Sequence, residues 1–585
     1  MRSGAGPDPR QRAVFKGERR RRVVLSLAAL SATICVCLAW PAKAQTVYVP
    51  LQHWVYDYLE RMETKGLLPG FLGNSRPLTR MEVAHALAAL GKQGSTDRLT
   101  RVEAEALAFL QCEFAEELCR LGSEVTAAPT RLHRLVHSRW LDPLLPDVLY
   151  ANGRNFLTIS SPPFQIFWDP VLVRRRQFAR ADSLARQERV FEDTNGFTLW
   201  GTVGRCLGFS VDVRDSRQWG TRTYPAAGTN YTLEGLGFVR SAGTSADHDE
   251  TRASLVFTWS FLTVQYGKDS NRWGPGRRGQ LGLSDHPTSY DLLKIQVAGT
   301  HLKLTSMIAW LQHYSPTFFH GGHQEKALAA HRLEFSLGKR VDIAVYETVV
   351  FAGRRLEPAY LIPVMFFRSA EHYLGDRDNA TMGADLEVKV IPKTRLYGEL
   401  FIDDVSTSKL GTGFYGNKTA FLVGAQLVDP CGLADVDLRI EYARVRPFTY
   451  SHARDVTSYV HYATCLGHWI GPNADDLYVE ASYRPTFWWE LRLWGEVRRH
   501  GENPAGQNVG GDLRVPHEYP RDPEYVPFLA GVRERTTATG VAASYQVVRN
   551  AFVSVAYRHF WASTERPDRG PGERGEWDII LSLNL

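Results

Sequence analysis

Long stretches of alternating apolar and polar side chains constrain the fold of this chain more than any other feature. From about residue 154 onward the hydrophobic pattern has a period of two, and its clearest runs are residues 384–390, 436–443 and 477–484. One apolar face and one charged face on strands of this length are typical of a β-barrel with lipid outside and a polar lumen. A soluble β-sandwich also alternates, but its strands are usually about five or six residues long.

The N-terminal segment predicts export from the cytoplasm. Four arginines at residues 19–22 precede an apolar run at residues 23–40, which is followed by the small-residue site Ala42-Lys43-Ala44. This is the pattern of a secretory signal peptide cleaved after Ala44, and an uncleaved anchor helix is the alternative. No later apolar run has spanning length, so a mature protein in a membrane must cross it as a β-barrel. The predicted location is therefore the outer membrane of a Gram-negative bacterium.

Removal of residues 1–44 changes the charge of the chain. The whole sequence carries 69 Lys and Arg against 63 Asp and Glu, whereas residues 45–585 carry 60 and 61. The basic excess belongs to the predicted signal peptide, so the composition gives no support for nucleic-acid binding.

The lengths of the connections also favour an outer-membrane barrel. Long polar connections, such as residues 352–381, 446–475 and 501–539, separate tight turns near residues 204–205, 260–261, 299, 338–339, 392–393, 430–432, 484–485 and 549–550. Short turns that alternate with long loops are the signature of outer-membrane barrels. Eight hairpins, an opening strand near residues 155–160 and a closing strand at 577–585 predict an antiparallel transmembrane barrel of about eighteen strands. Both ends then lie on the periplasmic, short-turn side, and the apolar run 231–240 lies in an outer loop.

The residues before the barrel predict a small helical domain. Thr79 with Glu82, and Thr100 with Glu103, have the spacing of capping boxes, and apolar residues follow each at helical spacing. We expect a signal peptide at residues 1–44, a helical periplasmic domain at 45–150 and the barrel at 151–585. The segment HWVYDYLERMETKGLLPGFLGNSRPLTRMEVAHAL resembles part of a surface-layer-homology module, which implies a contact with peptidoglycan or another cell-wall polymer.

The stretch DSNRWGPGRRG, residues 269–279, contains three glycines at G-x-G-x-x-G spacing. A dinucleotide-binding loop needs a helix that starts at these glycines, whereas the residues that follow lack helical periodicity. Pro275 also removes one of the amides that would bind phosphate. We therefore expect no nucleotide site here, and the strand count places this loop on the cell exterior.

Two outer segments carry the candidate binding residues of the predicted barrel. These segments combine charged side chains with aromatic ones, a mixture that is typical of sugar-binding sites. The apolar faces of sugar rings stack on aromatic side chains, while guanidinium and carboxylate groups bond to hydroxyl or acidic groups of the sugar. The alternative is that these side chains hold their own loops together. The candidate polysaccharide-binding residues are Arg272, Trp273, Arg277, Arg278, Asp285, Arg368, Glu371, Asp376 and Asp378.

Two longer motifs carry a family resemblance. The segment RWGPGRRGQLGLSDHP, followed by PVMFFRSAEHYLGDRDNATMGADLEVKVIPKTRLYGELFIDD, resembles the capsule assembly Wzi family of outer-membrane proteins. The resemblance covers about residues 150–585. It implies a periplasmic helical head, an eighteen-stranded barrel and the binding of capsular polysaccharide at the cell surface.

Three functions are open to such a barrel: binding and assembly of surface polysaccharide, diffusion as a porin or sugar channel, and hydrolysis. Asp403 and Asp404 are adjacent carboxylates, but neighbouring strand residues point to opposite faces and cannot form an acid/base pair. Gly-x-Ser-x-Gly and His-Glu-x-x-His motifs are absent from the sequence. We therefore predict a protein that is not an enzyme and has no catalytic residues.

The cysteines predict neither a metal site nor a disulfide framework. No Cys or His spacing indicates zinc, and we predict no metal and no cofactor. Cys431 lies in a predicted periplasmic turn and Cys465 in a predicted outer loop, so an apolar band of roughly 25 Å should keep them unpaired. The expected partners are surface polysaccharide, outer-membrane lipid and, through the helical domain, cell-wall polymer, with no nucleic acid.

Overall fold

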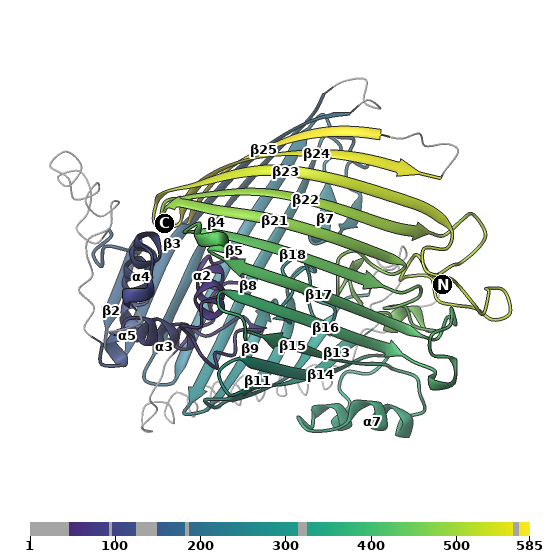
Figure 1. The fold of residues 1–585 in the computed structure, drawn as a ribbon, viewed down its shortest axis with the longest axis horizontal. Helices are drawn as coiled ribbons and strands as arrows, with labels where there is room; N and C mark the ends of the chain where they lie inside the picture. The colour runs from purple at the N-terminus through teal and green to yellow at the C-terminus, as the bar shows by residue number, and fades with distance from the viewer. Residues whose placement is uncertain are drawn as a thin grey trace, which may run out of the picture.

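Eighteen antiparallel strands close into a barrel in the computed structural model, which describes residues 46–92, 96–123, 149–181, 187–313, 325–565 and 572–584 (Figure 1). The predicted fold class is confirmed. β25 pairs with β3 to close the cylinder, from Arg574 opposite Ala181 to Asn584 opposite Val171. In chain order the strands are β3 (Phe164–Ala181), β4 (Glu188–Val203), β5 (Leu207–Gly220), β8 (Ser245–Trp259), β9 (Leu262–Asp269), β11 (Tyr290–Ala298), β12 (Leu302–Leu311), β13 (Lys326–Leu337), β14 (Val341–Ala352), β15 (Asn379–Val388), β16 (Thr394–Asp404), β17 (Lys418–Val428), β18 (Val436–Val445), β21 (Ala474–Thr486), β22 (Trp489–Glu502), β23 (Val532–Val548), β24 (Ala551–Thr564) and β25 (Gly572–Asn584).

The eight predicted tight turns are all found between paired strands, although the turn predicted at residues 484–485 lies at residues 487–488, after the end of β21. Ser260 and Asn550 lie in two of these turns with a φ of 54° each, the left-handed conformation that tight hairpins need. The predicted outer loop at residues 231–240 is also found. It carries a small hairpin of β6 (Asn230–Leu233) and β7 (Gly237–Ser241) in the connection from β5 to β8.

The predicted position of the opening strand is wrong. The barrel opens with β3, whereas the predicted segment forms β2 (Leu157–Ser161), a short strand that pairs with residues 164–168 of β3. β2 lies along the part of β3 that extends beyond the end of β25. The sequence obscures β3 because Pro170 and the arginine run at residues 174–176 interrupt its alternation.

Side chains of the strands point alternately to the membrane and to the lumen. On β18, Leu438 and Ile440 are exposed on the outward face, whereas Arg439 and Glu441 are buried. The predicted alternation on β15 and β21 follows the same rule. The apolar side chains therefore form the lipid-facing band, and the charged ones are enclosed by the barrel.

A head of four helices precedes the barrel in the described residues: α2 (Val55–Thr64), α3 (Arg80–Leu90), α4 (Arg101–Glu113) and α5 (Ala115–Arg120). Both predicted capping boxes are confirmed. The Glu82 backbone donates to the Thr79 hydroxyl at 3.2 Å and Thr79 N donates to the Glu82 carboxylate at 2.7 Å, and Thr100 and Glu103 do the same at 3.1 and 2.8 Å. None of the described helices is both long enough and apolar enough to cross a membrane. The predicted signal peptide lies outside the described residues.

The helical head lies across the short-turn end of the barrel (Figure 1). Arg549 in the turn between β23 and β24 donates to Glu113 of the head at 2.8 Å. The guanidinium carbon of Arg80 lies 4.3 Å from the ring centroid of Trp200 on β4. Arg395 of β16 lies 2.8 Å from Glu60 on the other side of the head. Contacts around so much of the circumference make the head a cap on this end of the barrel.

The cysteines of the described residues are all free, which agrees with the predicted absence of a disulfide between Cys431 and Cys465. Cys431 is exposed in the short turn between β17 and β18, and Cys465 is buried in the long loop between β18 and β21. The two residues therefore belong to opposite ends of the barrel.

Candidate binding site

The connection between β9 and β11, residues 270–289, runs into the barrel. Its two-residue strand β10 (Arg272–Trp273) pairs with β1 (Ser75–Arg76) of the head, and Trp273 is fully buried. Further along, the backbone of Ser284 donates to the carbonyl of Leu466 in the β18–β21 loop at 2.8 Å. The predicted exterior position of this segment, which we call the inward loop, is therefore wrong.

Two glutamates of the barrel wall hold the backbone of the inward loop. Glu441 on β18 accepts hydrogen bonds from the N–H groups of Arg277 and Arg278 at 2.6 and 2.9 Å. Glu399 on β16 accepts from the N–H groups of residues 281–282, both at 3.0 Å. Each carboxylate satisfies two successive amides, so the main chain of the loop is fixed inside the lumen by charge-assisted bonds.

The guanidinium groups of the inward loop are also paired inside the barrel. Arg277 Nη1 lies 2.7 Å from Asp57 Oδ1 of α2, and Arg278 Nη2 lies 2.6 Å from Glu496 Oε2 of β22. The guanidinium of Arg278 also lies over the ring of Tyr478, 4.7 Å from its centroid. These contacts match the alternative in which such side chains hold their own loop in place.

The glycines of the inward loop allow close packing. Gly274 has a φ of 122°, a conformation that residues with a side chain rarely adopt. A Cβ on Gly276 would lie 2.0 Å from the carbonyl oxygen of Gly279. No helix starts within the described residues 274–289, which agrees with the prediction that this is not a nucleotide loop.

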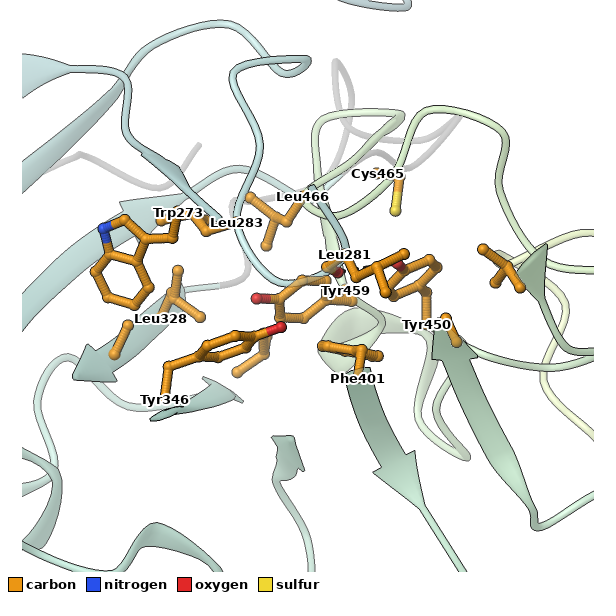
Figure 2. Close-up of a cluster of buried hydrophobic side chains, with 14 of the residues drawn as sticks. Trp273, Leu281, Leu283, Leu328, Tyr346, Phe401, Tyr450, Tyr459, Cys465 and Leu466 are labelled. Carbon is orange, nitrogen blue, oxygen red and sulfur yellow. Dashed lines mark hydrogen bonds between the residues drawn. The ribbon is translucent and has the colours of Figure 1, made fainter. Parts of the chain in front are cut away.

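A hydrophobic core fills the lumen where the inward loop meets the wall (Figure 2). The Tyr346 hydroxyl of β14 points into this core and donates to Glu399 at 2.8 Å. Because these side chains are apolar and packed, water is excluded from the core that they form. Its labelled members are Trp273, Leu281, Leu283, Leu328, Tyr346, Phe401, Tyr450, Tyr459, Cys465 and Leu466.

The other half of the lumen has a polar lining. Arg175 of β3 pairs with Asp578 of β25 at 2.7 Å, and Arg558 of β24 lies 2.6 Å from Glu576 of β25. The side chains of both arginines are about a third exposed. The lumen is therefore divided into a packed half and a polar half. The head lies across the short-turn end of both halves.

The remaining predicted binding residues lie around α7 (Phe367–Tyr373), in the connection between β14 and β15. Asp378 is fully buried and accepts a hydrogen bond from the Tyr360 hydroxyl at 2.8 Å. Glu371 is also buried, and burial raises the pKa of its carboxyl to about 7, although Arg368 at 2.8 Å acts to lower it. Asp376 and, in part, Arg368 are exposed.

The structure does not bring the nine predicted residues together. Those of the inward loop are enclosed in the lumen except Asp285, which is exposed. The group at α7 lies outside the barrel wall (Figure 1). Sequence analysis missed the partners Glu399, Glu441 and Asp57. Alternation predicts only that the two glutamates face the lumen, and Asp57 lies on a helix of the head, where no local pattern points to the inward loop.

The outer rim of the barrel carries a further candidate surface. A hollow of about 520 Å³ lies between the long-loop ends of β22, β23 and β24. Arg499, Arg533 and Arg535 line it together with Phe528, and the last two arginines are exposed. Guanidinium groups beside an aromatic ring suit a ligand that carries hydroxyl and acidic groups.

The fold and the filled lumen define the class of this protein. Its outer wall carries an apolar band, short turns join the strands at the capped end, and long loops join them at the other end. These are the features of an outer-membrane barrel with the short turns in the periplasm. This one encloses part of its own chain, so it is an outer-membrane β-barrel with an internal loop and a helical cap at its short-turn end.

Comparison with known proteins gives the family. Residues 195–573 match the family of capsule assembly protein Wzi, and the chain belongs to that family. The structure is similar to that of Wzi from Escherichia coli, an outer-membrane protein involved in group 1 capsule assembly and a carbohydrate-binding β-barrel. The two are 13% identical with a TM-score of 0.51, over 93% of this chain and 100% of that chain.

Other solved barrels are less similar. OccAB1 of Acinetobacter baumannii is 10% identical with a TM-score of 0.41, over 72% of this chain and 96% of that chain. OprD of Pseudomonas aeruginosa is 11% identical with a TM-score of 0.38, over 72% of this chain and 95% of that chain. No curated protein matches the sequence.

Proposed function

We propose that this protein binds a surface polysaccharide at its outer face and takes part in the assembly or attachment of a capsule. The observation that carries the proposal is membership of the capsule assembly family over residues 195–573. The Escherichia coli protein that shares the fold binds carbohydrate. The packed half of the lumen and the periplasmic cap oppose the alternative of a diffusion channel, because both stand in the path of a solute.

The polysaccharide has two accessible surfaces on which to bind. One is the rim hollow, where Arg533 and Arg535 offer exposed guanidinium groups. The other is the α7 connection, where Arg368 and Asp376 of the sequence-predicted set are accessible. Trp273 of that set has no accessible surface for stacking on a sugar ring in this conformation.

Retention of isolated capsular polysaccharide by the purified, detergent-solubilised protein tests the proposal. The double variant Arg533→Ala/Arg535→Ala should weaken retention by about tenfold or more, since each guanidinium forms charge-assisted bonds. Arg101→Ala removes an exposed arginine from the head on the other side of the membrane and serves as the matched control. Failure of the wild-type protein to retain the polysaccharide contradicts the function, whereas full retention by the folded double variant contradicts only the rim hollow.

The remaining inferences from sequence stay proposals. A contact between the head and cell-wall polymer rests on the surface-layer-homology resemblance, but Leu78 and Arg80 of that motif are buried against the rest of the protein. Such a contact would therefore use the other side of the head. That the protein is not an enzyme also remains a prediction, and in the fold Asp403 is buried while Asp404 is exposed on the opposite face of β16.

A further inference from the structure

The connection between β14 and β15, residues 353–378, packs against the outward face of the barrel wall. Successive side chains of β14 pack on opposite sides of the wall, in two separate hydrophobic clusters. Val350 packs in the lumen core, whereas Val349 and Phe351 pack outside it with Tyr360 and Phe367 of the connection. β12 and β13 divide between the two clusters in the same way. Figure 1 shows α7 beside the barrel next to β14, and not over its mouth.

The connection covers polar groups that the wall presents outward. His331 of β13 and Glu347 of β14 lie on the outward face and pair with each other at 3.2 Å. The backbone N–H of Phe367 donates to Glu347 at 2.9 Å, and the Phe367 ring lies 4.2 Å from the His331 ring. An ionisable pair facing lipid is costly, so the connection stabilises this part of the wall by staying docked on it.

The free side of the same connection exposes several large apolar side chains beside the polar Ser369 and His372. Val364 is 80% exposed, Phe366 is 56% exposed and Tyr373 is 92% exposed. Leu361 and Ile362 are also exposed, within the run AYLIPVMFF. A cluster of large apolar side chains on a folded protein marks a surface that is covered in its working environment.

The height of the apolar run along the barrel wall identifies what covers that run. Ten residues separate Val341 at the short-turn end of β14 from Phe351 under the connection. At about 3.3 Å per residue and a tilt of about 40°, this corresponds to about 25 Å along the barrel axis, the height of the apolar band. Val345 and Leu386, lower on the same wall, are exposed apolar residues of that band. The apolar run is therefore continuous with the lipid-facing surface at its outer edge.

We propose that residues 361–373 form a lateral foot that inserts into the outer leaflet, where acyl chains cover Val364, Phe366 and Tyr373. The chemistry is that of an interfacial amphipathic segment, which buries its apolar side at the boundary of head groups and acyl chains. This foot is independent of polysaccharide binding. It fixes the depth of the barrel in the membrane and holds the accessible Arg368 and Asp376 at the lipid surface.

Fluorescent labelling in lipid vesicles tests the foot. In a background in which Cys112, Cys119 and Cys431 are serine, Val364→Cys and Tyr373→Cys are labelled separately with an environment-sensitive dye. Tyr519→Cys, at a residue 77% exposed in the β22–β23 loop, is the matched control. Folding of each variant is checked by heat-modifiable migration in electrophoresis.

The labels at 364 and 373 should emit at shorter wavelength than the label at 519, and lipids with a nitroxide on the acyl chain should quench them at least twofold more strongly. Emission and quenching equal to those of the control would mean that the segment lies in water and would overturn the proposal. A blue shift without quenching by lipid would mean that protein, such as a second copy of the chain, covers the surface, and it would overturn the proposal as well.

Discussion

Glu60 of α2 is the carboxylate on which the docking of the head depends most. Its oxygens lie 2.8 Å from Arg395, 2.7 Å from Arg439 and 3.2 Å from Arg76. All four side chains are largely buried. Alternation on β18 predicts that Arg439 faces the lumen. It does not predict that Glu60 is its partner, because Glu60 lies in the head, far away in sequence, and nothing in the sequence around Arg439 indicates it.

We expect Glu60→Ala to destabilise the docked head by about 3–5 kcal/mol, because it leaves buried guanidinium groups without their shared partner. Limited proteolysis of the head in the solubilised protein measures this as a faster cleavage. Glu105→Ala is the control, since the exposed Glu105 lies 3.9 Å from Arg101, which is even more exposed, and such pairs contribute little. Equal cleavage rates in both variants would contradict a role for Glu60 in docking.

The inward loop is the element that sequence analysis predicts least well. Strand parity predicts correctly that its two ends leave β9 and β11 at the long-loop end. Its course into the lumen depends on Glu399, Glu441 and the head, and these long-range partners cannot be read from the loop itself. The turns, in contrast, follow from local chemistry such as Asn550 in the left-handed conformation, and all eight were predictable.

Trp273 tests whether the inward loop is a structural element. Trp273→Ala removes a fully buried side chain from the lumen core, and we expect the free energy of unfolding to fall by about 3–5 kcal/mol. The midpoint of heat-modifiable migration should fall accordingly. Tyr519→Ala, which removes an exposed ring from another long loop, should leave the midpoint unchanged. A stable Trp273→Ala protein that loses polysaccharide would instead support the sequence-predicted role of this residue in binding.

The whole barrel combines a packed half, a polar half and a cap. This arrangement predicts that the wild-type protein conducts no ions in planar bilayers. The Arg549–Glu113 pair joins the cap to the turn that borders the polar half. We expect Arg549→Glu to place two carboxylates together and to produce intermittent conductance, since the like charges repel. Arg549→Lys keeps the positive charge, and this variant should show no conductance. A large steady conductance in the wild-type protein would favour the porin alternative.

The pairing of β25 with β3 has a consequence for the way the protein is made. Arg175 and Asp578 bond across this seam although 403 positions separate them, and Glu113 meets Arg549 across 436 positions. The head and β3 leave the ribosome first, and their partners leave it last. Contacts of such separation form late in folding. Until β25 pairs with β3 and Arg549 meets Glu113, β3 keeps an unpaired edge and the head lacks its contact with the β23–β24 turn, so the chain needs protection from aggregation before the barrel closes.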